Sequence, residues 1–141
     1  MTLALVAGTR PEIIKMSPVL RRLGQERVDS RLILSGQHYD YEMCMAFIEE
    51  LGLPAPTSTL RLESTRPASQ IGEMMSRLEQ ALAQIGPQLL LVQGDTNTML
   101  AAALTGVKLG LRVAHIEAGL RSYDWRMPEE HNRRMVDHVS D

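Results

Sequence analysis

Residues Leu3-Ala-Leu-Val-Ala-Gly8 form a short apolar run that leads directly into Thr9-Arg-Pro-Glu12. An apolar run of this length that ends in glycine is typical of a strand buried on both faces, as in a parallel sheet. Pro11 indicates that a helix begins here, because proline is favoured at the first helical position, where its missing N–H has no partner to lose. This strand–turn–helix unit predicts an α/β protein.

The rest of the chain repeats the alternation of strands and helices. Further strands are predicted at Arg31–Ser35, Leu89–Val92 and Arg112–Glu117. Apolar spacing or alanine-rich composition predicts helices at Tyr41–Leu51, Gln70–Ile85, Thr96–Leu109 and Pro128–Val139. Strands that alternate with helices form a parallel sheet with right-handed crossovers, so we expect a sheet flanked by helices.

Prolines predict two irregularities in this pattern. Three prolines between Leu53 and Pro67 favour an irregular loop there. Pro18 is expected to kink the first helix or to reset it, because proline removes one hydrogen bond from the interior of a helix.

The bulk composition excludes several classes of protein. The 141 residues are 44% apolar and 23% charged, which indicates one folded domain rather than a disordered chain or a fibre. A net charge of −2 argues against a nucleic-acid partner bound through bulk electrostatics. No apolar run is long enough for a signal peptide or a membrane span. One cysteine, Cys44, cannot form an internal disulfide, so we expect a cytoplasmic protein.

The turn Gly8-Thr9-Arg10-Pro11-Glu12 is a candidate anion site. A helix N-terminus attracts phosphate, and Gly8 allows a close backbone approach. Arg10 would add a two-pronged contact, with Lys15 one turn further along the same face. The alternative is an ordinary tight turn with a solvated arginine. A Gly-x-Gly-x-x-Gly fingerprint for dinucleotides is absent from the sequence.

Two carboxylates follow predicted strands. Asp95 comes after the third strand, where the simpler interpretation is that Asp95 or Thr96 caps the next helix. Glu117 ends the fourth strand, and alternation along a strand predicts that it shares a face with His115. If the two strands are neighbours, Asp95 and Glu117 converge in the ligand crevice of the sheet and raise one carboxyl pKa, which suits acid–base chemistry. A salt bridge from Glu117 to Arg121 is the alternative.

The last predicted helix opens with Pro128, Glu129 and Glu130. The helix dipole favours acidic residues there, which explains at least one of the two glutamates without any catalytic role. Arg133 and Arg134 are expected to be surface ion-pair partners. No His-Glu-x-x-His pattern is present, so we predict no metal.

Five motifs then resemble a known family. They are Gly8-Thr-Arg-Pro-Glu-Ile-Ile-Lys-Met-Ser-Pro18, Gly36-Gln-His38, Gly94-Asp-Thr-Asn-Thr98, His115-Ile-Glu-Ala-Gly-Leu-Arg121 and Met127-Pro-Glu-Glu-His-Asn-Arg133. In this order they resemble the amino-terminal half of the non-hydrolysing UDP-N-acetylglucosamine 2-epimerases. The resemblance covers nearly the whole chain.

The resemblance implies a Rossmann-like domain that is the first half of a two-domain, GT-B-like fold. Residues 1–141 would then be a fragment that lacks the nucleotide-binding second domain, and we expect the isolated chain to be inactive. The implied reaction converts UDP-N-acetylglucosamine to UDP-N-acetylmannosamine by elimination and re-addition of UDP, without metal or other cofactor. The complete enzyme is expected to form a homodimer and to serve polysaccharide biosynthesis.

The resemblance also assigns residues. Asp95, Glu117 and Glu129 are the implied acid–base carboxylates, and the substrate site would include Gly8, Arg10, Lys15, His115 and Arg121. Gln37, His38 and Arg66 are candidates for a regulatory UDP-N-acetylglucosamine site. Tyr39-Asp40 departs from the Arg and Glu or Gln of many bacterial members, and Asp40 would repel a diphosphate.

Three other functions stay open on the sequence alone. A hydrolysing relative would use the same carboxylates and release UDP and free N-acetylmannosamine. A non-catalytic nucleotide-sugar-binding domain is the hypothesis of another class. A glycosyltransferase shares the fold, and fold alone does not decide function.

Overall fold

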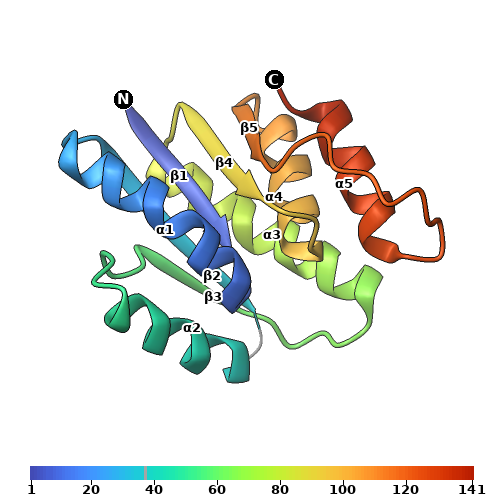
Figure 1. Cartoon of the computed structure of the whole chain (residues 1–141), viewed down its shortest axis with the longest axis horizontal. Helices are drawn as coiled ribbons and strands as arrows, with labels where there is room; N and C mark the ends of the chain where they lie inside the picture. Colours follow the sequence, from blue (N-terminus) through green and yellow to red (C-terminus); the bar gives the residue numbers. More distant parts are fainter. Residues whose placement is uncertain (37) are drawn as a thin grey trace.

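The computed structural model describes residues 1–36 and 38–141, and residues 38–41 by their backbone alone. Five parallel strands form one sheet in the order β3-β2-β1-β4-β5 (Figure 1). The strands are β1 (Thr2–Ala7), β2 (Asp29–Gly36), β3 (Ser58–Arg61), β4 (Leu89–Gln93) and β5 (Arg112–Ile116). The helices are α1 (Arg10–Gln25), α2 (His38–Glu50), α3 (Pro67–Ile85), α4 (Asn97–Lys108) and α5 (Pro128–Val139). The predicted α/β class with a parallel sheet is confirmed.

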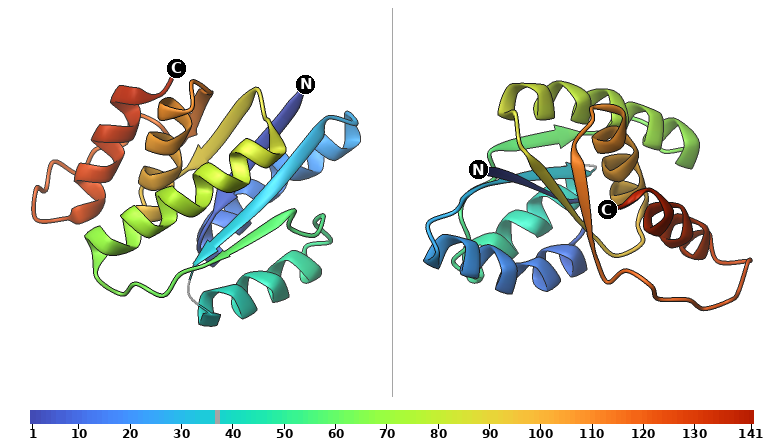
Figure 2. Two further views of the ribbon diagram at one scale, coloured as in Figure 1. Left: turned by 180° about the vertical axis from the view of Figure 1, so that it is seen from behind. Right: turned by 90° about the horizontal axis from the view of Figure 1, so that it is seen from above.

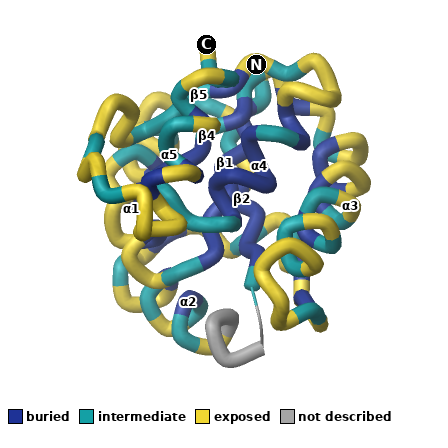
Figure 3. Tube along the Cα trace, turned by 90° about the vertical axis from the view of Figure 1, so that its right-hand side faces the viewer, coloured by how far each residue is buried: buried dark blue, intermediate teal, exposed yellow. Residues whose placement is uncertain are grey.

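The helices cover both faces of the sheet, as Figure 2 shows. Alternate residues of β1 pack into two separate cores. Leu5 and Ala7 contribute to the core under α1 and α2, whereas Ala4 and Val6 contribute to the core under α3 and α4. Figure 3 shows the buried strands between the more exposed outer helices. Burial on both sides explains why the first strand is an unbroken apolar run.

The order of the strands reverses beside β1. The chain passes from β1 outward to β2 and β3, and then returns to β4 on the other side of β1. Ligands of open α/β sheets bind outside the carboxyl ends of the strands at such a switch point. The turns after β1 and β4 therefore border the expected ligand crevice.

The edge strand β3 corrects the prediction of an irregular loop between Leu53 and Pro67. Residues Ser58–Arg61 pair with β2 in parallel register from Ile33 to Gly36. Only Leu60 of this strand is buried, so the segment has no apolar run that would distinguish it from a loop.

Pro18 lies inside α1, which continues without a break from Arg10 to Gln25. Proline has no N–H to donate to the carbonyl of Ile14. The hydroxyl of Ser17 donates to that carbonyl instead, over 2.9 Å. The predicted reset of the helix at Pro18 is therefore wrong, because the neighbouring side chain replaces the missing donor.

None of the helices in residues 1–36 and 38–141 combines the length and the apolar character needed to cross a membrane.

Candidate functional site

Glu117 lies directly after β5, and its backbone has a left-handed φ of 71°. This conformation is strained for a residue other than glycine, and such strain is concentrated at functional sites. The ammonium of Lys15, one turn into α1, contacts the two Glu117 carboxylate oxygens at 3.0 and 2.9 Å. The side-chain amide of Gln93, at the end of β4, donates to the same carboxylate. Three elements thus bring a carboxylate and a cation together at the switch point.

His115 is directed away from Glu117, so the prediction that they share a face is wrong. Its Nδ1 lies 2.6 Å from Asp137 of α5, and its Nε2 lies 2.8 Å from the carbonyl oxygen of Gly94. The left-handed turn at Glu117 breaks the alternation of the strand, which sends the glutamate toward α1 on the other side of the sheet. His115 connects β5 to α5 rather than contributing to the Lys15–Glu117 pair.

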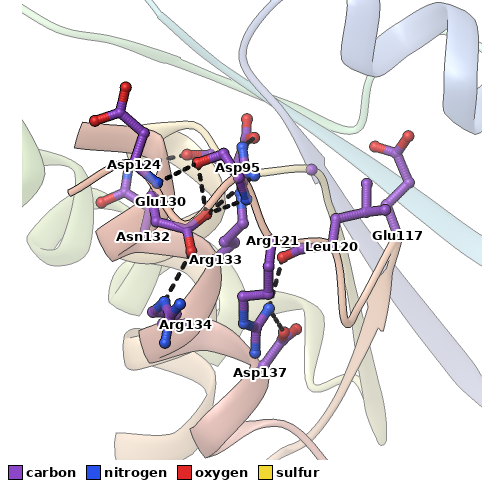
Figure 4. Close-up of polar contacts among 12 residues, drawn as sticks. Asp95, Glu117, Leu120, Arg121, Asp124, Glu130, Asn132, Arg133, Arg134 and Asp137 are labelled. Atoms are coloured by element: carbon purple, nitrogen blue, oxygen red, sulfur yellow. Dashed lines mark hydrogen bonds and ion pairs between the residues drawn. The ribbon is translucent and has the colours of Figure 1, made fainter. Parts of the chain in front are cut away.

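Asp137 is the partner of Arg121, which replaces the alternative salt bridge between Arg121 and Glu117. The Arg121 guanidinium lies 2.5 Å from Asp137 (Figure 4). The N–H of Gly119 donates to the same carboxylate over 3.0 Å. Burial raises the pKa of Asp137, but these donors outweigh it and hold the pKa below its usual range. Asp137 was not a predicted site residue, because nothing in the sequence links α5 to the turn after β5.

Asp95 pairs with Arg133 of α5 at 2.5 Å, and Arg133 also contacts Glu130 at 3.2 Å. Figure 4 shows the Asp95–Arg133–Glu130 cluster apart from Glu117, whose carboxylate points elsewhere. The predicted neighbours β4 and β5 are confirmed, yet Asp95 and Glu117 have different cationic partners. Each carboxylate is therefore paired with a cation of its own, Arg133 for Asp95 and Lys15 for Glu117.

The two glutamates at the start of α5 differ in burial. Glu130 has a fully buried side chain that accepts hydrogen bonds from Arg134 at 2.8 Å and from the backbone of Ser122 at 2.9 Å. Glu129 is exposed. Glu130 therefore anchors the helix, and Glu129 has a carboxylate available to a ligand. Arg133, predicted to lie on the surface, has a side chain only 13% exposed.

A carboxyl group of this chain, that of Glu12, occupies the turn before α1. Glu12 is 3% exposed and accepts hydrogen bonds from the backbone N–H groups of Gly8 at 2.7 Å and of Thr9 at 2.6 Å. The Thr96 hydroxyl donates to the other Glu12 oxygen over 2.5 Å, so the turns after β1 and β4 are joined. Burial raises the pKa of Glu12. The N–H groups of Gly8 and Thr9 are therefore not free for phosphate, and the anion site at the start of α1 stays a prediction.

The space next to Gly8 is also filled. A Cβ at this position would lie 2.2 Å from the Thr98 hydroxyl and 2.8 Å from the Ser35 carbonyl oxygen. The glycine allows α4 and β2 to approach β1 closely, rather than admitting a ligand to the backbone. Any contact with a diphosphate is left to the exposed side chains of Arg10 and Lys15. The Arg10 guanidinium lies over the Phe47 ring, 5.3 Å from its centre.

The remaining predictions concern regulation and metals. Gln37 and the side chain of His38 lie outside the described residues, and Arg66 is exposed at the N-terminus of α3. The regulatory site therefore stays a prediction. Within the described part of the chain, no cluster of three or more His, Cys, Asp and Glu side chains is arranged to hold a metal ion. Cys44 is buried in the core beneath α2.

Acid is expected to destabilise the fold through Glu130 and Glu73. Backbone N–H groups, of Ser122 and Ser64 respectively, lower both pKa values from 4.5 to about 2. A carboxyl group whose pKa is lowered by folding stabilises the protein fully at any pH above its pKa in the unfolded chain. This stabilisation is lost as the pH falls through the pKa of the group in the folded protein. Urea unfolding should therefore show a free energy that declines between pH 4.5 and 2.

Glu130→Gln tests this explanation, because it removes one of the two titrating groups. The variant should be less stable at neutral pH and should lose less stability between pH 4.5 and 2. If the free energy of unfolding falls with pH as steeply in the variant as in the unmodified protein, Glu130 makes no contribution to the acid sensitivity.

Known proteins resemble this chain along almost its whole length. Residues 21–141 match the family model for UDP-N-acetylglucosamine 2-epimerase. The UDP-N-acetylglucosamine 2-epimerase of Methanocaldococcus jannaschii is 48% identical over 140 residues, which are 99% of this chain and 38% of that protein. The UDP-2,3-diacetamido-2,3-dideoxy-D-glucuronate 2-epimerase of Pseudomonas aeruginosa is 41% identical over 142 residues, 100% of this chain and 40% of that protein.

Solved structures agree with the sequence matches. The M. jannaschii UDP-GlcNAc 2-epimerase in complex with UDP-GlcNAc and UDP gives a TM-score of 0.93 at 48% identity, covering 99% of this chain and 39% of that one. Acinetobacter baumannii MurG, at 10% identity and a TM-score of 0.64, shares the fold alone. The chain thus spans less than half the length of these proteins. Because the family model covers most of the chain and the relatives align along almost all of it, this chain belongs to the UDP-N-acetylglucosamine 2-epimerase family.

Proposed function

We propose that this chain is the amino-terminal domain of an enzyme that inverts C2 of UDP-N-acetylglucosamine. A second domain would follow it and close the active site over the carboxyl end of the sheet. The observation that carries the proposal is the placement of Glu117, a partly exposed carboxylate held at the switch point beside a lysine. Family membership adds independent support.

The chemistry matches what these residues supply. The hydrogen at C2 has no neighbouring carbonyl, so it is barely acidic, and its removal becomes feasible when UDP leaves from C1. A carboxylate takes the C2 proton, the C1–O bond breaks, and an alkene and UDP result. Protonation on the opposite face and return of UDP give the epimer, with no net oxidation. Proton transfer needs carboxylates, and the departing diphosphate needs cations.

We assign the roles accordingly. Lys15 and the exposed Arg10 neutralise the diphosphate, and Glu117 transfers protons. Asp95 and Glu129 complete the carboxylate set when the second domain encloses them, since Glu129 is exposed here and Asp95 is held by Arg133. A closed, dry cleft would keep the alkene bound until it is protonated.

The complete protein, supplied with UDP-N-acetylglucosamine in deuterium oxide, tests the proposal. Nuclear magnetic resonance should show UDP-N-acetylmannosamine that carries deuterium at C2. Turnover without this label would overturn the elimination mechanism. Free N-acetylmannosamine with UDP would instead identify a hydrolysing enzyme, and binding of UDP without turnover would identify a non-catalytic domain.

A different sugar is the second candidate, because a relative at 41% identity is named for a diacetamido-glucuronate substrate. Comparison of kcat/KM for the two UDP sugars decides between them. We also expect a cytoplasmic homodimer, whose mass sedimentation velocity would measure.

A further inference from the structure

The Glu117 carboxylate has two donors that differ in mobility and charge. Lys15 has a side chain 51% exposed on a flexible stem, and its ammonium contacts both carboxylate oxygens. Gln93 is 2% exposed at the end of β4, and its neutral amide contacts one oxygen. One donor can move to another partner, whereas the other is fixed in the sheet.

Glu117 depends on these donors for its position. Its left-handed backbone lies beyond the last residue of β5, so the regular pairing of the sheet ends before it. The side chain is 33% exposed, and its carboxylate is contacted by the Lys15 ammonium and the Gln93 amide. Gly94, directly after Gln93, is also left-handed, and a Cβ there would lie 3.9 Å from the Glu117 carboxylate. The turn after β4 and the carboxylate therefore lie side by side.

In the proposed reaction, a diphosphate that arrives at the site would compete with Glu117 for Lys15. The diphosphate has more negative charge than one carboxylate, and the lysine ammonium is a point charge that can turn toward it. The Gln93 amide cannot follow, because its side chain is buried at the end of a strand. An amide N–H can also donate to a carboxylate oxygen and to the carbonyl oxygen of the neutral acid alike.

We infer that Gln93 is the positioning residue that holds Glu117 in place once a nucleotide diphosphate has drawn Lys15 away. Gln93 acts through Glu117 and does not touch the sugar. This inference rests on the proposed function, in which Glu117 transfers the C2 proton. Loss of the amide should therefore impair the chemical step more than binding.

The test uses the complete enzyme with Gln93→Met, which keeps the length of the side chain and removes its donor. We expect kcat to fall about tenfold or more, as for a lost hydrogen bond to a charged group, with KM within about threefold of the unmodified enzyme. Gln93→His retains an N–H at a similar distance from the backbone and should recover most of kcat. Gln80→Met, on the exposed side of α3, is the matched control and should leave both constants unchanged.

A second variant keeps the inference testable if Gln93→Met fails to fold. Gln93→Asn keeps a buried amide but withdraws it by one methylene, so it should lose kcat as Gln93→Met does. A kcat within threefold of the unmodified enzyme in either variant overturns the inference, as does a loss that histidine fails to recover. If the unmodified enzyme itself does not epimerise, the proposed function fails instead, which keeps the two outcomes distinct.

Discussion

Replacing Glu117 with glutamine is expected to lower kcat of the complete enzyme by about 10²- to 10⁴-fold, the range lost when a general acid or base is removed. Glutamine keeps an oxygen that accepts from Lys15 or Gln93 but cannot take a proton from C2. KM should change little, because the cations that hold the diphosphate remain. Steady-state kinetics, together with deuterium incorporation at C2, measures the effect.

Glu79→Gln provides the control, because Glu79 is exposed on α3, which packs on the opposite face of the sheet from α1. Its kcat should match that of the unmodified enzyme. A Glu117→Gln enzyme that retains more than a tenth of the activity would remove this carboxylate from proton transfer.

Replacing Glu12 with leucine should lower the free energy of unfolding by about 3 kcal/mol, because the buried N–H of Gly8 and the part-buried N–H of Thr9 lose their acceptor at about 1–3 kcal/mol each. Glu12→Gln keeps one oxygen for Gly8 and Thr9, and the Thr96 hydroxyl can turn to accept from the new amide. The glutamine variant should therefore be much less affected. Urea unfolding of both variants at neutral pH is the measurement, and equal losses in the two would refute the role of the acceptor.

The sign of the pH effect at Glu12 is opposite to that at Glu130. Burial raises the Glu12 pKa above 4.5, so its stabilising contribution is present below pH 4.5 and is lost as the pH rises through the folded value. Glu12→Gln should remove this component and make the protein's stability less sensitive to pH above 4.5.

Local patterns in the sequence were enough to predict four of the strands and the helices α2 to α5 within a few residues of their ends, and the start of α1. Strands buried on both faces are recognisable because neither face is polar. Edge strand β3 cannot be recognised in this way, because its one buried residue, Leu60, gives no pattern of apolar residues. The continuity of α1 was missed because a hydroxyl at Ser17 replaces the donor that Pro18 lacks, which depends on rotamer rather than on residue type alone.

The site was less predictable for physical reasons. Its polar contacts join residues distant in sequence, such as Glu12 with Thr96 and Asp95 with Arg133. The structure has a Thr9-x-x-Glu12 capping box, a signal that the prediction of a phosphate site at this turn left out. Nothing local indicated the left-handed backbone at Glu117, on which its separation from His115 depends.

At position 117 the stability of the fold and the proposed activity favour different residues, because the left-handed backbone there is strained for glutamate. Glycine or asparagine adopts that conformation at lower cost, by an amount on the order of 1 kcal/mol. A selection for thermostable variants would therefore favour either residue at 117 and would discard the carboxylate with the strain.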